Sequence, residues 1–280
     1  MVEKKGLRKK ILFWGAIIAV MAFCLFPFVM MFSSAFKLSE GQFDYPPKII
    51  PQEITFQHFK DVLNPEVFPY FTFFKNSLMV ASITAGLSVL VATFGAYSFT
   101  RLKYKGQKLI QRGVLFIYMF AGILLVIPLF QIVVNAGLYD TRLSLIITYL
   151  VQTLPVSLYM LGNYFRTIPE SIEEAAIIDG CSRVEVIFKI IFPLSAPALV
   201  SVFIYAFMIA WNEYLFASVF LTSEGNFTLP MGLNSLFHTQ HYIWGRMMAA
   251  SLLTAIPVIV LFLMVEKFIS GGLTFGGVKE

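Results

Sequence analysis

Three sets of side chains have the types and spacing that chemistry needs. Glu213 is the only acid well inside an apolar stretch, where a carboxyl group could carry a coupled proton or pair with a neighbouring helix. His238 and His241 stand three apart, as metal ligands can, but with no nearby carboxylate or thiol we expect no metal site. The third set is acidic, because five of the 16 Asp and Glu residues fall between Arg166 and Lys189.

Catalysis and nucleotide use are not indicated by any motif in the chain. At membrane depth there is no Ser/His pair, metal-ligand set or pair of carboxylates, so an intramembrane enzyme is not supported. The sequence has no GxxxxGKS/T phosphate loop. Cys24 and Cys181 lie in an apolar run and in a charged segment, and neither belongs to a CxxC pair. We therefore expect no enzyme activity, no bound cofactor and no disulfide.

The elements that position these residues must lie in lipid. Of the 280 residues, 58% are hydrophobic and only 13% are charged, whereas a soluble domain has about 25% charged residues. Six stretches are long enough for a bilayer, which needs roughly 20 apolar residues of helix. They are residues 11–32, 76–99, 113–139, 143–165, 198–220 and 247–265. The sequence predicts an all-α polytopic membrane protein with six transmembrane helices, in a single transmembrane domain over residues 1–280.

The placement of basic residues predicts the orientation of the chain. With a cytoplasmic N-terminus, 15 of the 21 Lys and Arg residues lie on the cytoplasmic side. This imbalance predicts that both termini are cytoplasmic, with residues 266–280 as a cytoplasmic tail. It also accounts for the basic clusters, so we expect no nucleic-acid partner. The first apolar run is too long for a secretory signal and is interpreted as a retained helix.

Two long external segments, residues 33–75 and 221–246, are candidates for a functional role outside the membrane. In the first, Phe56, Phe59, Val62 and Leu63 recur at helical spacing, which predicts a short amphipathic helix. The second is rich in Gly, Asn, Ser and Thr.

The acidic set lies on a predicted cytoplasmic helical hairpin, residues 166–197. Pro169 suits a first helical position, and Gly180 supplies the left-handed residue that ends the first helix. Ser182 and Glu185 have the spacing of a capping box for the second helix. The acids of this hairpin are Glu170, Glu173, Glu174, Asp179 and Glu185.

The first helix of the hairpin has a shallow face. Ile172, Ala175 and Ala176 have the spacing of one helical face, and paired alanines let another backbone or groove approach closely. We interpret this protruding helix as a docking device, although an ordinary solvated helix would also suit the composition.

These residues carry a resemblance to a known family. Glu174, Ala175, Ala176, Gly180, Ile190 and Pro193 resemble the EAA loop of binding-protein-dependent ABC import permeases, with Phe192 where Leu is usual. The sequences Trp211-Asn212-Glu213 and Thr228-Leu229-Pro230, Pro257, and the tail from Gly272 to Lys279 resemble the carbohydrate branch of that family.

The resemblance implies a set of partners. It implies a homologous permease subunit, two ATPase subunits that hold ATP and Mg, an extracytoplasmic sugar-binding protein, and a multi-pass location in the cell membrane. ATPase coupling would fall to Glu174, Ala175, Ala176, Asp179 and Gly180, and the ATPase-contacting tail would be Gly276, Gly277 and Lys279. The loop at Gly225, Asn226 and Phe227 would dock the binding protein.

The role of Glu213 has two interpretations. On a helix that begins near Ala198, Glu213 shares a face with Ala206, Ala210 and Ala217, so it should face protein or a watery cavity. A pairing role between helices is favoured over sugar contact. Sugars are held by neutral hydrogen bonds and ring stacking, so a translocation path could instead use Trp211, Asn212 and Glu213.

Two functions follow from these alternatives. The first is a permease subunit that imports a sugar by alternating access, driven by ATPase subunits. The second is a proton-coupled secondary transporter that uses Glu213, a class that usually has several buried ionisable groups and internally repeated halves. Only one such group and no repeat are found in this sequence.

Overall fold

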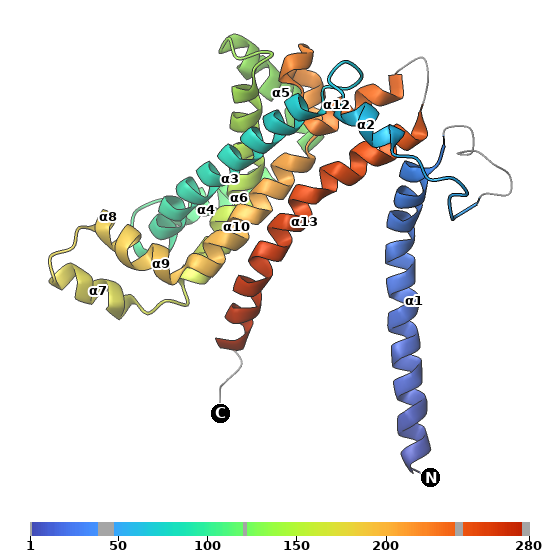
Figure 1. Ribbon diagram of the computed structural model, residues 1–280. Coiled ribbons are helices and arrows are strands. Elements are labelled where there is room, and N and C mark those ends of the chain that lie inside the picture. The colour runs from blue at the N-terminus through green and yellow to red at the C-terminus, as the bar shows by residue number, and fades with distance from the viewer. Residues whose placement is uncertain (1, 39–47, 120–121, 239–242, 276–280) are drawn as a thin grey trace. The chain divides into compact units, whose positions relative to one another are not determined.

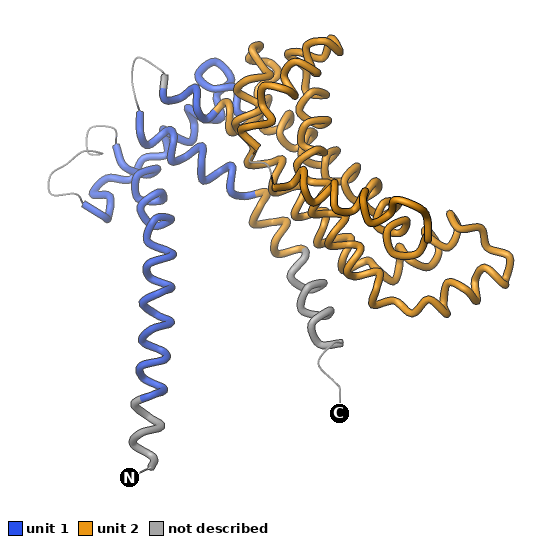
Figure 2. The backbone as a smooth tube through the Cα atoms, turned by 180° about the vertical axis from the view of Figure 1, so that it is seen from behind, with its two compact units in different colours: residues 1–70, 233–256 blue, residues 71–232, 257–280 orange. Residues whose placement is uncertain are grey.

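The computed structural model describes residues 2–38, 48–119, 122–238 and 243–275 (Figure 1). Within these ranges every named element is helical, and the one pairing of extended chain is an isolated bridge between Lys37 and Ile54. The chain divides into two compact units, distinguished by colour in Figure 2. Unit 1 holds residues 1–70 and 233–256, and unit 2 holds residues 71–232 and 257–280.

Unit 1 is built around the first helix. Its elements are α1 (Val2–Phe36), α2 (Gln57–Leu63), η4 (Leu236–His238) and the first part of α13 (Trp244–Phe275). The ring of Phe36 packs on Phe56 and Phe59, and the ring of His58 bonds through Nε2 to the carbonyl of Lys37 at 2.8 Å. The short helix expected within residues 33–75 is thus confirmed as α2.

Unit 2 contains the remaining helices. They are α3 (Tyr70–Arg101, which begins one residue before the unit), α4 (Gln107–Tyr118), α5 (Gly122–Asn135), α6 (Arg142–Phe165), α7 (Glu170–Ile178), α8 (Arg183–Val186), η2 (Ile187–Ile191), α9 (Phe192–Leu194), α10 (Ala196–Asn212), α11 (Leu215–Phe220), η3 (Glu224–Asn226) and α12 (Leu229–Ser235, which runs into unit 1). Helix α6 is central, because α4, α5, α10 and α11 all pack against it. Ser88 on α3 also bonds to Thr153 on α6 at 2.7 Å.

The helices have the length and apolarity of a polytopic membrane protein. Four of them can each cross a bilayer, and they lie at Lys9–Phe36, Tyr70–Arg101, Arg142–Phe165 and Trp244–Met264. The number rises to six if each of two bent helix pairs counts as one span. The most apolar 18-residue part of α1 buries none of its residues within the described chain, as lipid or partner contact requires. The expected all-α membrane fold is therefore confirmed.

Two of the expected spans differ in detail from single straight helices. Residues 113–139 are divided between α4 and α5, and α5 ends at Asn135 ahead of Gly137, whose φ is +69°. The span expected at residues 198–220 is interrupted between α10 and α11, where Glu213 has extended backbone angles. The reason for this second interruption is the hydrogen bonding of Glu213, described below.

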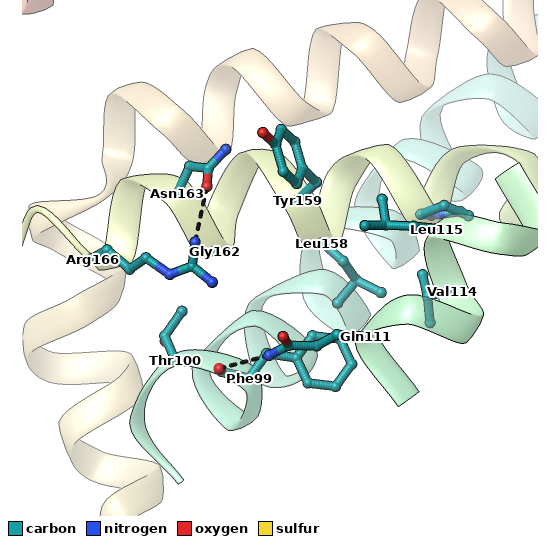
Figure 3. A pocket seen from close by; sticks show the side chains of 11 residues that line it. Phe99, Thr100, Gln111, Val114, Leu115, Leu158, Tyr159, Gly162, Asn163 and Arg166 are labelled. Carbon is teal, nitrogen blue, oxygen red and sulfur yellow. Dashed lines mark hydrogen bonds between the residues drawn. The ribbon is translucent and has the colours of Figure 1, made fainter. Parts of the chain in front are cut away.

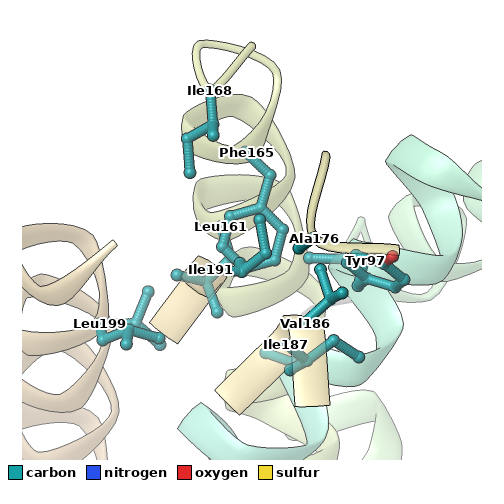
Figure 4. Close-up of a cluster of buried hydrophobic side chains, with 12 residues drawn as sticks. Tyr97, Leu161, Phe165, Ile168, Ala176, Val186, Ile187, Ile191 and Leu199 are labelled. Carbon is teal, nitrogen blue, oxygen red and sulfur yellow. The ribbon is translucent and has the colours of Figure 1, made fainter. Parts of the chain in front are cut away.

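A packed apolar cluster supports the hairpin of α7 and α8. Tyr97 from α3, Leu161 and Phe165 from α6, and Ala176 from α7 meet Ile191 of η2 in this cluster (Figure 4). The cluster joins the hairpin to the spanning helices, so a movement of α7 must repack side chains on α3 and α6.

Candidate functional site

The predicted hairpin is present, with the local signals that its sequence indicates. Helix α7 runs from Glu170 to Ile178 and is preceded by Pro169. Gly180 follows with φ of +90°, the left-handed conformation predicted to end the helix. Ser182 and Glu185 form the expected capping box, in which each side chain bonds to the other residue's backbone N–H.

One arginine fixes α7 to the spanning helices. Arg101, the last residue of α3, donates through Nε to a carboxylate oxygen of Glu173 at 2.5 Å. Its Nη2 donates to the backbone carbonyls of Phe165 and Ile168 at 2.8 Å each. The side chains of Arg101 and Glu173 are only 7% and 6% exposed. Arg101 thus joins α3, the end of α6 and α7 in one buried charged network.

The rest of the α7 surface is exposed and carries both apolar and acidic side chains. Ile178 is 85% exposed, and Ile172 and Ile177 are also exposed. Glu174, Ala175, Asp179 and Gly180 lie on the exposed surface as well, whereas Ala176 is turned inward at 7% exposure. The expectation that Ile172, Ala175 and Ala176 form one docking face is therefore wrong for Ala176, because that residue packs in the apolar cluster.

An exposed ion pair joins α8 to η2. Lys189 Nζ donates to Glu185 at 2.7 Å, and the N–H and hydroxyl of Ser182 also donate to that carboxylate. The Lys189 ammonium, followed by the Ser182 donors, lowers the pKa of Glu185 to about 2, and the same pair raises the pKa of Lys189. Both groups are in solvent, so the pair stabilises the hairpin only slightly.

At the other end of unit 2, an asparagine holds the predicted docking loop. The side-chain amide of Asn76 donates to the carbonyls of Gly225 and Phe227 at 2.9 Å each. Its oxygen accepts a hydrogen bond from Arg142 at 2.8 Å. Because Asn76 is 2% exposed, these bonds form away from water and fix the loop on α3 and α6.

Asp140 fastens the same loop from the α5–α6 connection. Its carboxylate accepts hydrogen bonds from the backbone N–H groups of Thr222 and Ser223 and from the Ser223 hydroxyl, and its carbonyl accepts one from Asn226. The Ser223 hydroxyl, followed by the two N–H groups, lowers the pKa of Asp140 to about 2. Asp140 has φ of +58°, a conformation that Asp tolerates better than most residues.

Glu213 makes structural bonds at the break between α10 and α11. Its carboxylate accepts a hydrogen bond from the Tyr149 hydroxyl at 2.7 Å, and from the N–H groups of Phe216 and Ala217 at 2.9 and 3.3 Å. These donors belong to α6 and to the first turn of α11. A carboxylate that accepts from the start of the next helix explains why α10 stops there.

The neighbours of Glu213 differ from each other in exposure. Trp211 is 1% exposed, stacks on Phe207 with a centroid distance of 5.5 Å, and meets Phe74 edge to face. Asn212 is exposed and donates to the carbonyl of Met208. The three residues proposed for a path therefore do not line one cavity together, and their role in the path stays a prediction.

A cavity of about 120 Å³ lies between α3, α4 and α6, near the ends of α3 and α6 that meet α7 (Figure 3). All of its polar side chains except Tyr159 are already paired within the described chain. Gln111 donates to the carbonyl of Phe99 at 2.9 Å, and Arg166 donates to Asn163 at 3.3 Å. The cavity thus offers a solute few free polar groups.

The other predicted sites lie partly beyond the described chain. Gly276, Gly277 and Lys279 of the predicted ATPase-contacting tail are outside the described residues, as is His241. Among residues that the structure describes, no group of three His, Cys, Asp or Glu side chains could hold a metal ion.

The sequence does not point to Arg101 as the residue that holds α7, or to Asn76 as the residue that holds the loop at residues 225–227. Arg101 was counted only as one of the basic residues that set the orientation, and Asn76 as the start of a span. The available signal was their position, because a polar side chain at each end of a long apolar helix needs a partner from another segment. Which segment supplies it depends on the tertiary fold.

This geometry describes an all-helical membrane protein with a hairpin firmly packed on one side and open on the other. A family model described as "Binding-protein-dependent transport system inner membrane component" matches residues 68–270. The chain therefore belongs to this family of ABC transporter permeases.

Several relatives match over nearly their whole length. The chain is 48% identical over 279 residues to the inner membrane ABC transporter permease protein YcjP of Escherichia coli, with 100% of each chain covered. It is 36% identical over 280 residues to the trehalose/maltose transport system permease protein MalG of Thermococcus litoralis, with 99% of each covered. It is 33% identical over 268 residues to the diacetylchitobiose uptake system permease protein DasC of Streptomyces coelicolor, covering 95% of this chain and 96% of that one.

Solved structures share the fold. A chain in the crystal structure of a bacterial ABC transporter that imports the acidic polysaccharide alginate superposes with a TM-score of 0.79 at 24% identity, covering 93% of this chain and 96% of that chain. A second alginate transporter structure, with a pentasaccharide-bound periplasmic protein, gives a TM-score of 0.68 at 15% identity, with 94% of each chain covered. The protein is thus a multi-pass inner membrane permease component, and ATP hydrolysis resides in partner subunits.

Proposed function

We propose that this chain is one permease subunit of an importer for sugars or oligosaccharides, which moves its solute by alternating access. The relatives named for trehalose, maltose and diacetylchitobiose support this substrate class. The other subunits would be a homologous permease, two ATPase subunits that hold ATP and Mg, and an extracytoplasmic sugar-binding protein. The chain would form a single permease domain, with both termini in the cytoplasm.

The observation that carries this proposal is the asymmetry of α7. The inward side is fixed by the buried Arg101–Glu173 pair, and the rest of the helix leaves Ile172, Ile177 and Ile178 exposed. Exposed apolar side chains beside acidic ones are typical of a protein interface. An ATPase seated on this face would move α7, and Arg101 would pass that movement to α3 and α6. In this account Glu174 and Asp179 contact the ATPase, and so does the tail at Gly276, Gly277 and Lys279.

The loop at Gly225, Asn226 and Phe227 supports the binding-protein part of the proposal. Gly225 is exposed while its carbonyl is held by Asn76, so the loop presents a fixed surface. A loop that is already ordered loses little conformational entropy when a partner docks.

The hydrogen bonds of Glu213 favour its structural interpretation over proton coupling. Its carboxylate holds Tyr149 and the first turn of α11 together, so protonation would weaken a contact between helices. Transport driven by ATPase subunits gives this residue no coupling role.

A pair of glycine variants tests the coupling role of α7. Gly180 and Gly106 both have positive φ, +90° and +87°, and neither would bring a Cβ within 4 Å of another group. A Val at either position costs about 1–2 kcal/mol of backbone strain. We expect Gly180→Val to assemble and hydrolyse ATP but to lose sugar uptake in proteoliposomes, whereas Gly106→Val keeps its uptake. Equal uptake per ATP in both variants would contradict the proposal.

A further inference from the structure

A second cavity of unit 2 lies among the spanning helices, away from the hairpin. It is bordered by the end of α4, the start of α5, and the middle of α6 and α10. Three of its lining side chains are polar, and these are Tyr118, Gln152 and Tyr205. Gly122, Leu125 and Ile209 are among the apolar remainder.

The polar groups of this cavity are left without protein partners. The amide of Gln152 and the hydroxyls of Tyr118 and Tyr205 make no hydrogen bond with any other residue in the described part of the chain. A free amide among spanning helices is costly, because lipid supplies no hydrogen bonds. The other polar residues of the same stretch of α6 are satisfied. Thr148 and Thr153 bond to carbonyls one turn earlier at 2.7 and 2.9 Å.

The contrast with the cavity of Figure 3 strengthens the point. There, the amide of Gln111 is bonded to the carbonyl of Phe99, and Asn163 is bonded to Arg166. Gln152 instead has donors and an acceptor available for something that enters the cavity. Water or a hydroxylated solute can satisfy it.

The chemistry of the lining limits the solute. A carboxamide and two phenols supply neutral hydrogen bonds, and the phenol rings supply flat apolar faces. None of the described lining residues is charged. This combination suits the hydroxyl groups and ring faces of an uncharged sugar, and it lacks the cation that would balance an acidic one.

The volume of the cavity limits how much of a solute it can enclose. About 160 Å³ is less than the roughly 300–1,000 Å³ of sites that enclose a whole ligand. This chain therefore supplies part of a wall, and the homologous permease would supply the rest. Such a partial contact suits a solute in transit.

We propose that Tyr118, Gln152 and Tyr205 contact a neutral saccharide as it crosses the membrane. This inference rests on the proposed importer function and adds to it the substrate class and the residues. It replaces the path predicted at Trp211, Asn212 and Glu213 with side chains on α4, α6 and α10.

The test uses the full transporter in proteoliposomes with its binding protein. The probes are radiolabelled maltose, trehalose and diacetylchitobiose, with an alginate oligosaccharide as the acidic probe. We expect uptake of at least one neutral probe and none of the acidic one. Uptake of the alginate probe alone would overturn the neutral-saccharide assignment. No uptake of any probe by a wild-type complex that hydrolyses ATP would count against this assignment and against the sugar-importer function together.

Matched variants then separate the contact from the importer function. In Gln152→Leu and Tyr205→Phe we expect about 5- to 10-fold less sugar moved per ATP, the effect of one lost hydrogen bond. Their binding-protein-stimulated ATP hydrolysis should stay within about twofold of wild type, as expected when only the solute contact is lost. Gln111→Leu and Tyr159→Phe are the controls, because both residues line the other cavity. Wild-type ratios of sugar to ATP in Gln152→Leu and Tyr205→Phe would overturn the inference while leaving the importer function intact.

An accessibility measurement gives a second readout. Gln152→Cys, placed in a chain whose Cys24 and Cys181 are replaced by Ser, should react with a water-soluble thiol reagent, and the transported neutral probe should slow the reaction. Labelling that is absent in every nucleotide state would contradict a solute path at this position.

Discussion

The two ends of α3 are fastened in different ways to loops with different surfaces. At Arg101 a buried ion pair holds α7, whose exposed surface carries isoleucine and acidic side chains. At Asn76 neutral amide bonds hold the loop of residues 222–228, whose outer face contains Ser223, Glu224 and Gly225. About 38 Å of one helix separates the two fastenings. A rigid helix with a fixed loop at each end can carry displacement between two proteins that never meet.

The difference between the ends suits different kinds of contact. An apolar, acid-flanked face that remains seated on a partner gains from buried area. A polar loop that is already ordered suits a partner that docks and leaves. The comparison therefore predicts unequal results when each fastening is removed.

The largest effect is expected at the buried charge. Arg101→Met leaves the Glu173 carboxylate buried without its partner, which costs about 3–5 kcal/mol. We expect a lowered unfolding temperature in detergent and loss of sugar-dependent ATP hydrolysis. Glu170→Gln is the control, because Glu170 is 70% exposed and lies 3.8 Å from Arg101.

A double variant sharpens this result. Arg101→Met with Glu173→Leu removes both charges, so part of the stability should return. The carbonyls of Phe165 and Ile168 still lack their donor, and the link between α3 and α7 stays weakened. If Arg101→Met unfolds at the same temperature as Glu170→Gln, then Arg101 does not anchor α7.

The next effect is expected at the other fastening. Asn76→Leu removes two donated hydrogen bonds and leaves Arg142 without its acceptor, which costs about 2–3 kcal/mol. Stimulation of ATP hydrolysis by the loaded binding protein should fall, while hydrolysis without binding protein persists. Asn163→Leu, at an exposed amide, is the comparison for stability. If the binding protein stimulates ATP hydrolysis equally well in Asn76→Leu, then this loop does not take part in docking the binding protein.

A smaller effect is expected at Gly232, where the chain follows the docking loop. A Cβ there would lie 2.2 Å from the buried ring of Phe73, so Gly232→Ala should cost about 1–3 kcal/mol in thermal unfolding. Gly86→Ala in α3 meets nothing within 4 Å and should be neutral or stabilising. Adding Phe73→Leu to Gly232→Ala should recover part of the loss, and failure to do so would point to another cause.

The smallest effect is expected from pH, because Asp140 is in solvent. Its pKa falls from 3.8 to about 2 in the folded loop, so its stabilisation is complete above about pH 4 and is lost as pH falls toward 2. Amide exchange at Thr222 and Ser223 should quicken over that interval. In Asp140→Ala it should be fast at every pH, and an unchanged profile would show that the carboxylate does not hold these amides.

The sequence predicted the helices and their caps better than the tertiary contacts between them. The hairpin, the left-handed Gly180 and the Ser182–Glu185 capping box follow from local signals, and all three are present. These features depend on neighbours within four residues, which a single sequence displays directly.

Features that depend on distant partners were beyond the sequence. The bonds from Arg101 to Glu173 and from Asn76 to Phe227 join residues 72 and 151 positions apart. The break at Glu213 was missed for the same reason, because a continuous apolar run conceals a carboxylate that accepts from the next helix turn and from Tyr149. Helical periodicity predicts that Glu213 shares a helix face with Ala206 and Ala210. Helix α10 ends at Asn212, so Glu213 is not part of that helix.

The most direct test of the account is a photo-cross-linking measurement on the assembled transporter. A photoreactive residue in place of Ala175, on the open face of α7, should form an adduct with an ATPase subunit. The same residue in place of Ser223 should form an adduct with the binding protein and none with the ATPase. A complex that hydrolyses ATP but gives no ATPase adduct at position 175 would contradict the claim that α7 couples the permease to its motor.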